Sequence, residues 1–205
     1  KKYSEALKLI NEVLNIKSNY QPALRDKAVV LYYLKKADKG LTYIQESLKQ
    51  NPADYIALNA LGLIYMAMEM YDEAKKALNQ SIKTNPNYVP SYNNLGRCYS
   101  LQHDRKLEMK YYKKALELNP DFKESINNIA NYYNETGSYE KAIQYYFKAL
   151  EKENENPEIL YNIGVAYSYL KEFNKAEEYY KKSNALNPDD GKLRKNYSML
   201  LLAMQ

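Results

Sequence analysis

Asparagines recur at a fixed spacing along this chain, and their amides are the side chains best suited to contact another molecule. One row consists of Asn94, Asn128, Asn162 and Asn196, and a second row consists of Asn59, Asn93 and Asn127. Within each row, successive members are 34 residues apart. Because an amide both donates and accepts hydrogen bonds, a row of amides can hold a peptide backbone with little regard to its side chains. The spacing therefore predicts a binding surface for a protein or peptide.

Catalytic chemistry finds little support in the sequence. The chain has one cysteine, Cys98, and one histidine, His103, which are too few to form a typical zinc site. We expect Cys98 to be a small buried residue and His103 to lie on the surface. The glycines are isolated and form no phosphate-binding loop, and no pair of carboxylates stands out as an acid and a base. We therefore expect no catalytic residue, no metal and no cofactor, and a protein that is not itself an enzyme.

Composition and charge exclude several further classes. The formal net charge of +5 is spread over 205 residues in short lysine pairs among acids, which is typical of solvated helix faces rather than of nucleic-acid binding. No apolar run approaches the roughly 18 residues of a membrane span. We expect a cytoplasmic protein. Because the sequence begins at Lys1 without a methionine, we expect it to be a fragment of a longer protein.

The same period of 34 residues runs through the whole chain. Asn-Pro pairs end at Pro52, Pro86, Pro120 and Pro188, of which the first three are 34 residues apart and the last two periods further on. No insertion is needed to keep this register. The sequence divides into a half repeat at 1–20, full repeats at 21–54, 55–88, 89–122, 123–156 and 157–190, and a half repeat at 191–205. A constant period of this length predicts a single stacked solenoid.

Each repeat is predicted to form two helices, so the fold class is all-α with about twelve helices. Numbering every repeat from place 1 to place 34 shows which residue types recur. Place 8 is always small, which indicates that the two helices of a repeat approach closely there. Its residues are Ala28, Gly62, Gly96, Ala130, Gly164 and Ser198. Since the chain has 24 tyrosines, many of them at fixed places, we interpret most of them as core residues.

These residues resemble the tetratricopeptide repeat family over the entire chain. In repeat 55–88 the shared motif consists of Leu58, Leu61, Gly62, Tyr65, Ala74, Leu78, Ser81 and Pro86. The resemblance implies an α-solenoid of antiparallel helix pairs, wound as a right-handed superhelix. It also implies that the first helices of the repeats line a concave groove that holds an extended peptide or a partner helix.

The expected groove contacts come from places on the exposed face of the first helices. Besides the two asparagine rows, these places hold Arg97, Asn131 and Tyr161. The sixth-place asparagine is a ligand contact in several repeat families, and the row is similar to that of the protein O-GlcNAc transferase superhelix. The alternative interpretation is that the row is merely a solvated surface.

Two regions depart from the repeat pattern. In repeat 89–122, Glu108 takes the small-residue place 20 and Arg105 takes an otherwise aromatic place, so we expect a looser contact between its helices and a pairing of these two charges. At the end of the chain, residues 197–204 are apolar nearly all round the helix. We expect a further helix, domain or subunit to pack on this segment.

The sequence therefore predicts a non-catalytic interaction module or scaffold with a protein partner in its groove. Two alternatives remain open. One is a substrate-recruiting arm of a larger enzyme, such as a protein O-GlcNAc transferase, and the other is a structural subunit of a large assembly.

Overall fold

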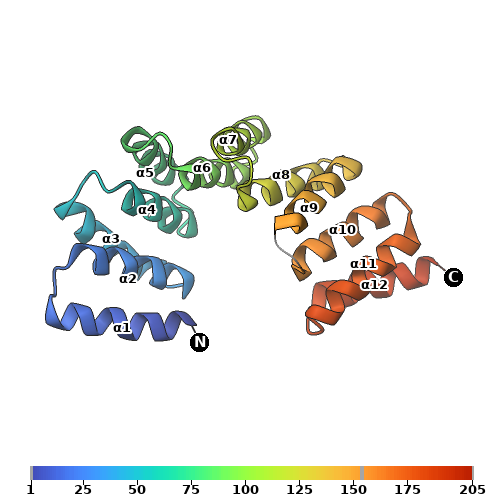
Figure 1. Cartoon of the computed structure of the whole chain (residues 1–205), viewed down its shortest axis with the longest axis horizontal. Helices are drawn as coiled ribbons and strands as arrows, with labels where there is room; N and C mark the ends of the chain where they lie inside the picture. The colour runs from blue at the N-terminus through green and yellow to red at the C-terminus, as the bar shows by residue number, and fades with distance from the viewer. Residues whose placement is uncertain (1, 153–154, 205) are drawn as a thin grey trace. The chain divides into compact units, whose positions relative to one another are not determined.

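A computed structural model describes residues 2–152 and 155–204. Within these residues the chain is entirely helical, with no strand, and contains twelve α-helices (Figure 1). Their bounds are α1 Lys2–Ile16, α2 Gln21–Tyr33, α3 Ala37–Gln50, α4 Tyr55–Ala67, α5 Tyr71–Thr84, α6 Val89–Leu101, α7 Arg105–Leu118, α8 Lys123–Glu135, α9 Tyr139–Lys152, α10 Pro157–Tyr169, α11 Phe173–Leu186 and α12 Gly191–Ala203. Helices of 13 to 15 residues joined by short turns confirm the prediction of an all-α fold.

The chain forms two compact units. The N-terminal unit, Lys1–Leu118, contains α1 to α7, and the C-terminal unit, Asn119–Gln205, contains α8 to α12. Within each unit every helix packs on the next, and the first helices of adjacent repeats also touch: α2 contacts α4, α4 contacts α6, α8 contacts α10 and α10 contacts α12. This arrangement of stacked helix pairs is an α-solenoid.

Three of the first helices begin with a side-chain cap. Asp54 accepts hydrogen bonds from the N–H groups of Ile56 and Ala57, both at 3.0 Å, and so satisfies two amides that the first turn of α4 leaves free. Asn156 and Asp190 cap α10 and α12 in the same way. All three residues occupy place 34, whereas Tyr20, Tyr88 and Phe122 at the same place form no side-chain cap.

The turns between the two helices of a repeat use a left-handed residue. Place 15 has a positive φ in all five full repeats: Lys35, Glu69, His103 and Lys171 at about 60° and Gly137 at 78°. A residue with a side chain is about 1–2 kcal/mol less stable in this conformation, so the tight turn is maintained by the helices packed on either side. The expected surface position of His103 is confirmed, since it is exposed within this turn.

Close approach of the two helices at place 8 is confirmed in the full repeats. A Cβ atom built on Gly62, Gly96 or Gly164 would lie 2.6, 2.6 or 2.5 Å from the side chain of Leu78, Tyr112 or Tyr180, respectively. Ala28 and Ala130 take the same place in the other repeats and are fully buried. The small residue therefore leaves room for the large side chain at place 24.

The interpretation of the recurrent tyrosines as core residues is confirmed at place 24, whereas most other tyrosines are half-buried and Tyr3, Tyr20, Tyr33 and Tyr169 are exposed. Tyr112, Tyr146 and Tyr180 at place 24 are at most 2% exposed. The tyrosines at place 11 are half-buried, and three of them pair with a second-helix tyrosine: Tyr99 with Tyr111, Tyr133 with Tyr145 and Tyr167 with Tyr179, at centroid distances of 5.4 to 5.7 Å. Much of the aromatic content thus packs one helix of a repeat against the other.

Repeat 89–122 confirms one expectation and corrects another. Arg105 Nη1 and Glu108 Oε2 are 2.9 Å apart, as predicted from their spacing on α7. The expected looser contact between α6 and α7 is wrong, because Gly96 lies as close to Tyr112 as Gly62 lies to Leu78. The Glu108 side chain is accommodated because its charge is paired, and it is only 3% exposed.

Candidate functional site

In the N-terminal unit the asparagines form hydrogen bonds with one another between neighbouring repeats. Asn59 on α4 accepts hydrogen bonds from Asn94 Nδ2 and Ser91 Oγ on α6, at 2.9 and 3.3 Å. Asn94 Oδ1 in turn accepts from Arg97 Nη1 at 3.4 Å. Asn59 is 7% exposed and Asn94 is 6% exposed, so this part of the row joins two repeats more than it faces solvent.

Two serines that the sequence analysis did not single out as site residues extend this network to α5. Ser81 Oγ and Ser91 Oγ lie 2.7 Å apart, and Ser81 donates to the backbone carbonyl of Tyr55 at 2.7 Å. Ser81 occupies place 27, where Ser47 and Ser183 make the same bond to the carbonyl at place 1 of their own repeats. The recurrence of serine at place 27 was the signal available in the sequence.

We expect the substitution Asn59→Ala to lower the free energy of unfolding by about 1–2 kcal/mol. The substitution removes the acceptor of two bonds and leaves the buried Asn94 amide without that partner. Urea denaturation followed by circular dichroism measures the effect. The exposed Asn79→Ala on α5 is the control, and an equal effect of the two substitutions would contradict a structural role of Asn59.

The C-terminal unit repeats the pattern with different partners. Asn131 Oδ1 on α8 accepts from Tyr146 OH at 2.7 Å and from Asn162 Nδ2 on α10 at 3.4 Å. Burial raises the pKa of the Tyr146 phenol, which keeps the hydroxyl protonated and able to donate. Asn131 and Asn162 are both half-buried, whereas Asn59 and Asn94, the bonded pair in the N-terminal unit, are buried.

A second link joins α10 to α12. Asn196 Nδ2 donates to the hydroxyl of Tyr161 at 2.7 Å. Burial also raises the pKa of Tyr161, so the hydroxyl stays neutral. Three members of the place 6 row, Asn94, Asn162 and Asn196, each donate to the first helix of the preceding repeat and so link two repeats within one unit.

The remaining predicted site residues lie on the same two first helices, α6 and α8. Asn93 is buried at 4% exposure, Arg97 is half-buried, and Asn127 and Asn128 are half-buried on α8. The Oδ1 atom of Asn127 is buried and has no hydrogen-bond partner among the described residues. The half-buried members of the set are therefore Arg97 in one unit and Asn127, Asn128, Asn131, Tyr161, Asn162 and Asn196 in the other.

The described residues include no cluster of side chains suited to a metal ion. They contain no group of three or more histidine, cysteine, aspartate or glutamate side chains placed to hold a metal ion. Cys98 is fully buried, as predicted, and burial raises the pKa of its thiol. The chemistry that this surface can perform is hydrogen bonding by amides and hydroxyls. In the part of the chain that the structure describes, no helix is both long and apolar enough to cross a membrane.

Several solved structures have a similar fold, and two of them are described as tetratricopeptide repeat proteins. This chain is similar to PilW, a type IV pilus biogenesis factor, with a TM-score of 0.79 and 21% identity over 94% of this chain and 90% of that chain. It is similar to TTC0263 of Thermus thermophilus, with a TM-score of 0.76 and 24% identity over 89% and 99%. It is also similar to YrrB, a protein described as having an unusual peptide-binding site, with a TM-score of 0.62 and 20% identity over 93% and 97%.

The fold and the repeated packing places define a solenoid of helix pairs. Four models of the tetratricopeptide repeat match residues 54–121, 111–144, 130–171 and 157–190, which together run from residue 54 to residue 190. The chain belongs to the tetratricopeptide repeat family. A comparison with curated protein sequences finds no match.

Proposed function

We propose that the chain is a non-catalytic interaction module that binds an extended peptide or a partner helix along its first helices. The observation that carries the proposal is the row of half-buried amides and the phenol in the C-terminal unit: Asn131, Tyr161, Asn162 and Asn196. Each amide has more hydrogen-bonding capacity than its observed bonds use. The groups left over can bond to a peptide backbone.

The bonds between the amides support binding as well as stability. A side chain already held by a neighbour loses less freedom when a ligand contacts it, and this lowers the entropic cost of binding. In the N-terminal unit the asparagines at places 5 and 6 are buried and Arg97 at place 9 is half-buried. We therefore assign Asn59, Asn93 and Asn94 to holding the helices and Arg97 to contacting the partner. We keep Asn127 and Asn128 as contacts at the corresponding places of α8.

Protein-interaction roles are the general function of this repeat family, and one structural relative is described as a peptide-binding protein. A larger enzyme that uses this chain as its substrate-recruiting arm would bind through the same surface. A role as a subunit of a large assembly would also require a second surface. The side chains of Leu201 and Leu202 on α12, which are 41% and 70% exposed, are suited to pack against a further helix, domain or subunit.

The double variant Asn162→Ala/Asn196→Ala tests the proposal. Peptides selected by phage display on the unmodified protein supply the ligands, and fluorescence anisotropy gives their Kd. We expect at least about a tenfold increase in Kd, the value for the loss of one or two modest hydrogen bonds. The matched control is Asn79→Ala/Asn174→Ala, which removes two exposed amides from the second helices α5 and α11.

Equal affinities of the two double variants would contradict the proposal and would leave the row with a structural role only. Circular dichroism of both variants verifies that the helices are retained.

A further inference from the structure

Stacked tyrosines fill one recurring junction between repeats. At this junction place 17, near the start of a second helix, meets place 13 of the following first helix. Tyr3 stacks on Tyr33 with centroids 4.9 Å apart and rings 7° from parallel. Tyr139 stacks on Tyr169 with centroids 4.7 Å apart and rings 1° from parallel. The two pairs have nearly the same geometry, one in each unit, so this junction has room for two parallel stacked rings.

At two other junctions place 13 is alanine, and each of them is hollow. Phe173 and Ala203 line a pocket of about 290 Å³ in the C-terminal unit. Ala37 and Ala67 line another of about 450 Å³ in the N-terminal unit. The junction at Phe173 has an aromatic ring at place 17, as the junctions at Tyr3 and Tyr139 do. It lacks the second ring, because place 13 is Ala203 instead of tyrosine.

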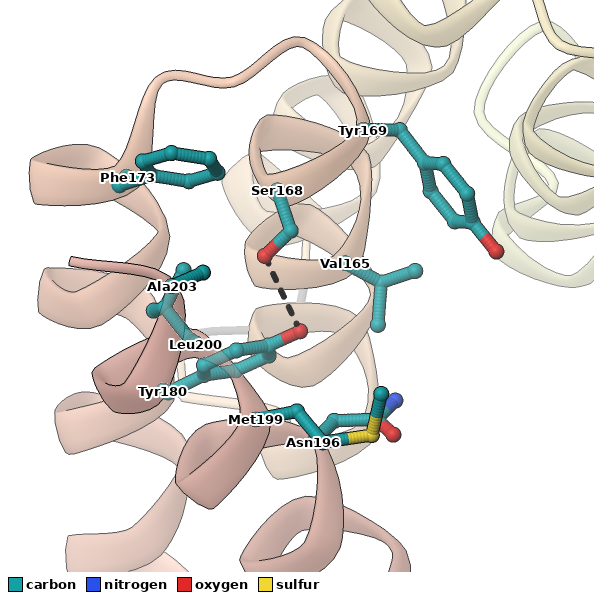
Figure 2. Close-up of a pocket in the computed structure, with 9 residues that line it drawn as sticks. All are labelled: Val165, Ser168, Tyr169, Phe173, Tyr180, Asn196, Met199, Leu200 and Ala203. Carbon is teal, nitrogen blue, oxygen red and sulfur yellow. Dashed lines mark hydrogen bonds between the residues drawn. The ribbon is translucent and has the colours of Figure 1, made fainter. Parts of the chain in front are cut away.

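The lining of the pocket at Phe173 suits a phenol ring. Figure 2 shows its side chains, which come from α10, α11 and α12, and the dashed line between two hydroxyls. Val165, Met199 and Leu200 supply apolar atoms. The hydroxyls, Ser168 Oγ and Tyr180 OH, are 3.4 Å apart. An apolar wall with a pair of hydroxyls can take an aromatic body that has a polar end.

We propose that the pocket between Phe173 and Ala203 binds an aromatic side chain of the partner peptide, with tyrosine as the best fit. A cavity of about 150 Å³ is enough to bind benzene, so this pocket has room for a ring. The incoming ring would stack on Phe173 in the way that Tyr169 stacks on Tyr139. The proposal rests on the proposed function, since Asn196, one of the amides expected to hold the peptide backbone, also lines the pocket.

The probe for the test is N-acetyl-tyrosinamide, and the readout is the NMR spectrum of the protein with labelled methionine and alanine methyl groups. We expect saturable shifts of the Met199 and Ala203 methyl signals, with a Kd on the order of 1 mM for so small a ligand. N-acetyl-leucinamide is expected to bind about two- to tenfold more weakly, because it cannot stack. Equal binding of the two probes, or no shift with either, overturns the proposal.

The substitution Ala203→Tyr fills the junction from within, as Tyr169 does on Tyr139, and should abolish binding of the probe. Ala67→Tyr is the matched control, because it fills the other hollow junction and should leave the Met199 shift unchanged. Phe173→Leu keeps an apolar residue but removes the ring, and it should also weaken binding of the probe. This variant serves as the test if Ala203→Tyr proves poorly folded. Binding that neither pocket substitution weakens overturns the proposal.

The selected peptides separate this proposal from the one on which it rests. If Asn162→Ala/Asn196→Ala weakens peptide binding and Ala203→Tyr does not, the peptide surface stands and the aromatic pocket is wrong. If the probe binds in the pocket but the peptides bind independently of the amides, the proposed peptide surface is wrong and the pocket is not part of it. Loss of peptide binding in both variants supports both proposals.

Discussion

Arg105→Ala should lower the free energy of unfolding by about 3 kcal/mol, the lower end of the range for breaking a buried ion pair. The reason lies in the unequal exposure of the two partners. Glu108 is 3% exposed and Arg105 is 35% exposed, so removing the arginine leaves a buried carboxylate without the cation 2.9 Å away. Urea denaturation of the variant and the unmodified chain measures the difference.

Glu108→Ala is expected to change stability by less than about 1 kcal/mol, because the arginine left behind is 35% exposed and water can solvate its charge. Place 20 supports this expectation, since Ala74, Ala142 and Ala176 occupy it in other repeats and are fully buried. The double variant Arg105→Ala/Glu108→Ala should then be more stable than Arg105→Ala alone. A Glu108→Ala variant as unstable as Arg105→Ala would show that packing of the glutamate chain, and not its charge, determines the effect.

Gly164→Val should lower the free energy of unfolding by about 3 kcal/mol, the upper end of the usual cost of overpacking a core. A Cβ atom at this position would lie 2.5 Å from the Tyr180 ring, and the ring is itself 1% exposed. The small gain in helix propensity from replacing glycine, a few tenths of a kcal/mol, does not offset this clash. Thermal or urea denaturation measures the loss.

Gly191→Val is the matched control, because Gly191 also lies in a first helix but a Cβ atom built on it would have nothing within 4 Å. It should leave stability within about 0.5 kcal/mol of the unmodified chain. A double-mutant cycle with Tyr180→Ala supplies a second check: the double variant should be more stable than the sum of the single effects predicts, since the smaller residue relieves the clash. If the effects of Gly164→Val and Tyr180→Ala were simply additive, the loss of stability would not come from a clash between these two residues.

The sequence by itself determined the helices, their pairing and the class of fold. These features depend on interactions between residues close in the chain: the helical spacing of apolar residues, prolines near helix ends, and small residues at place 8 in every repeat. The pairing of Arg105 with Glu108 was equally predictable, because residues three apart on a helix are neighbours. The constant period of 34 residues then identified which places are equivalent.

Only the tertiary structure decided which asparagines are buried and which residues they bond to. The bonds of Asn94 to Asn59 and of Asn196 to Tyr161 join residues 35 apart, and their geometry depends on how neighbouring repeats pack. The sequence predicted the row but not its burial in the N-terminal unit. The left-handed turns were likewise hidden, because four of the five residues at place 15 are not glycine and their conformation is imposed by the packed helices on either side. The hollow junction at Ala203 became visible only when its ring-filled equivalents were seen in space, since a missing side chain leaves a pocket only where its surroundings stay in place.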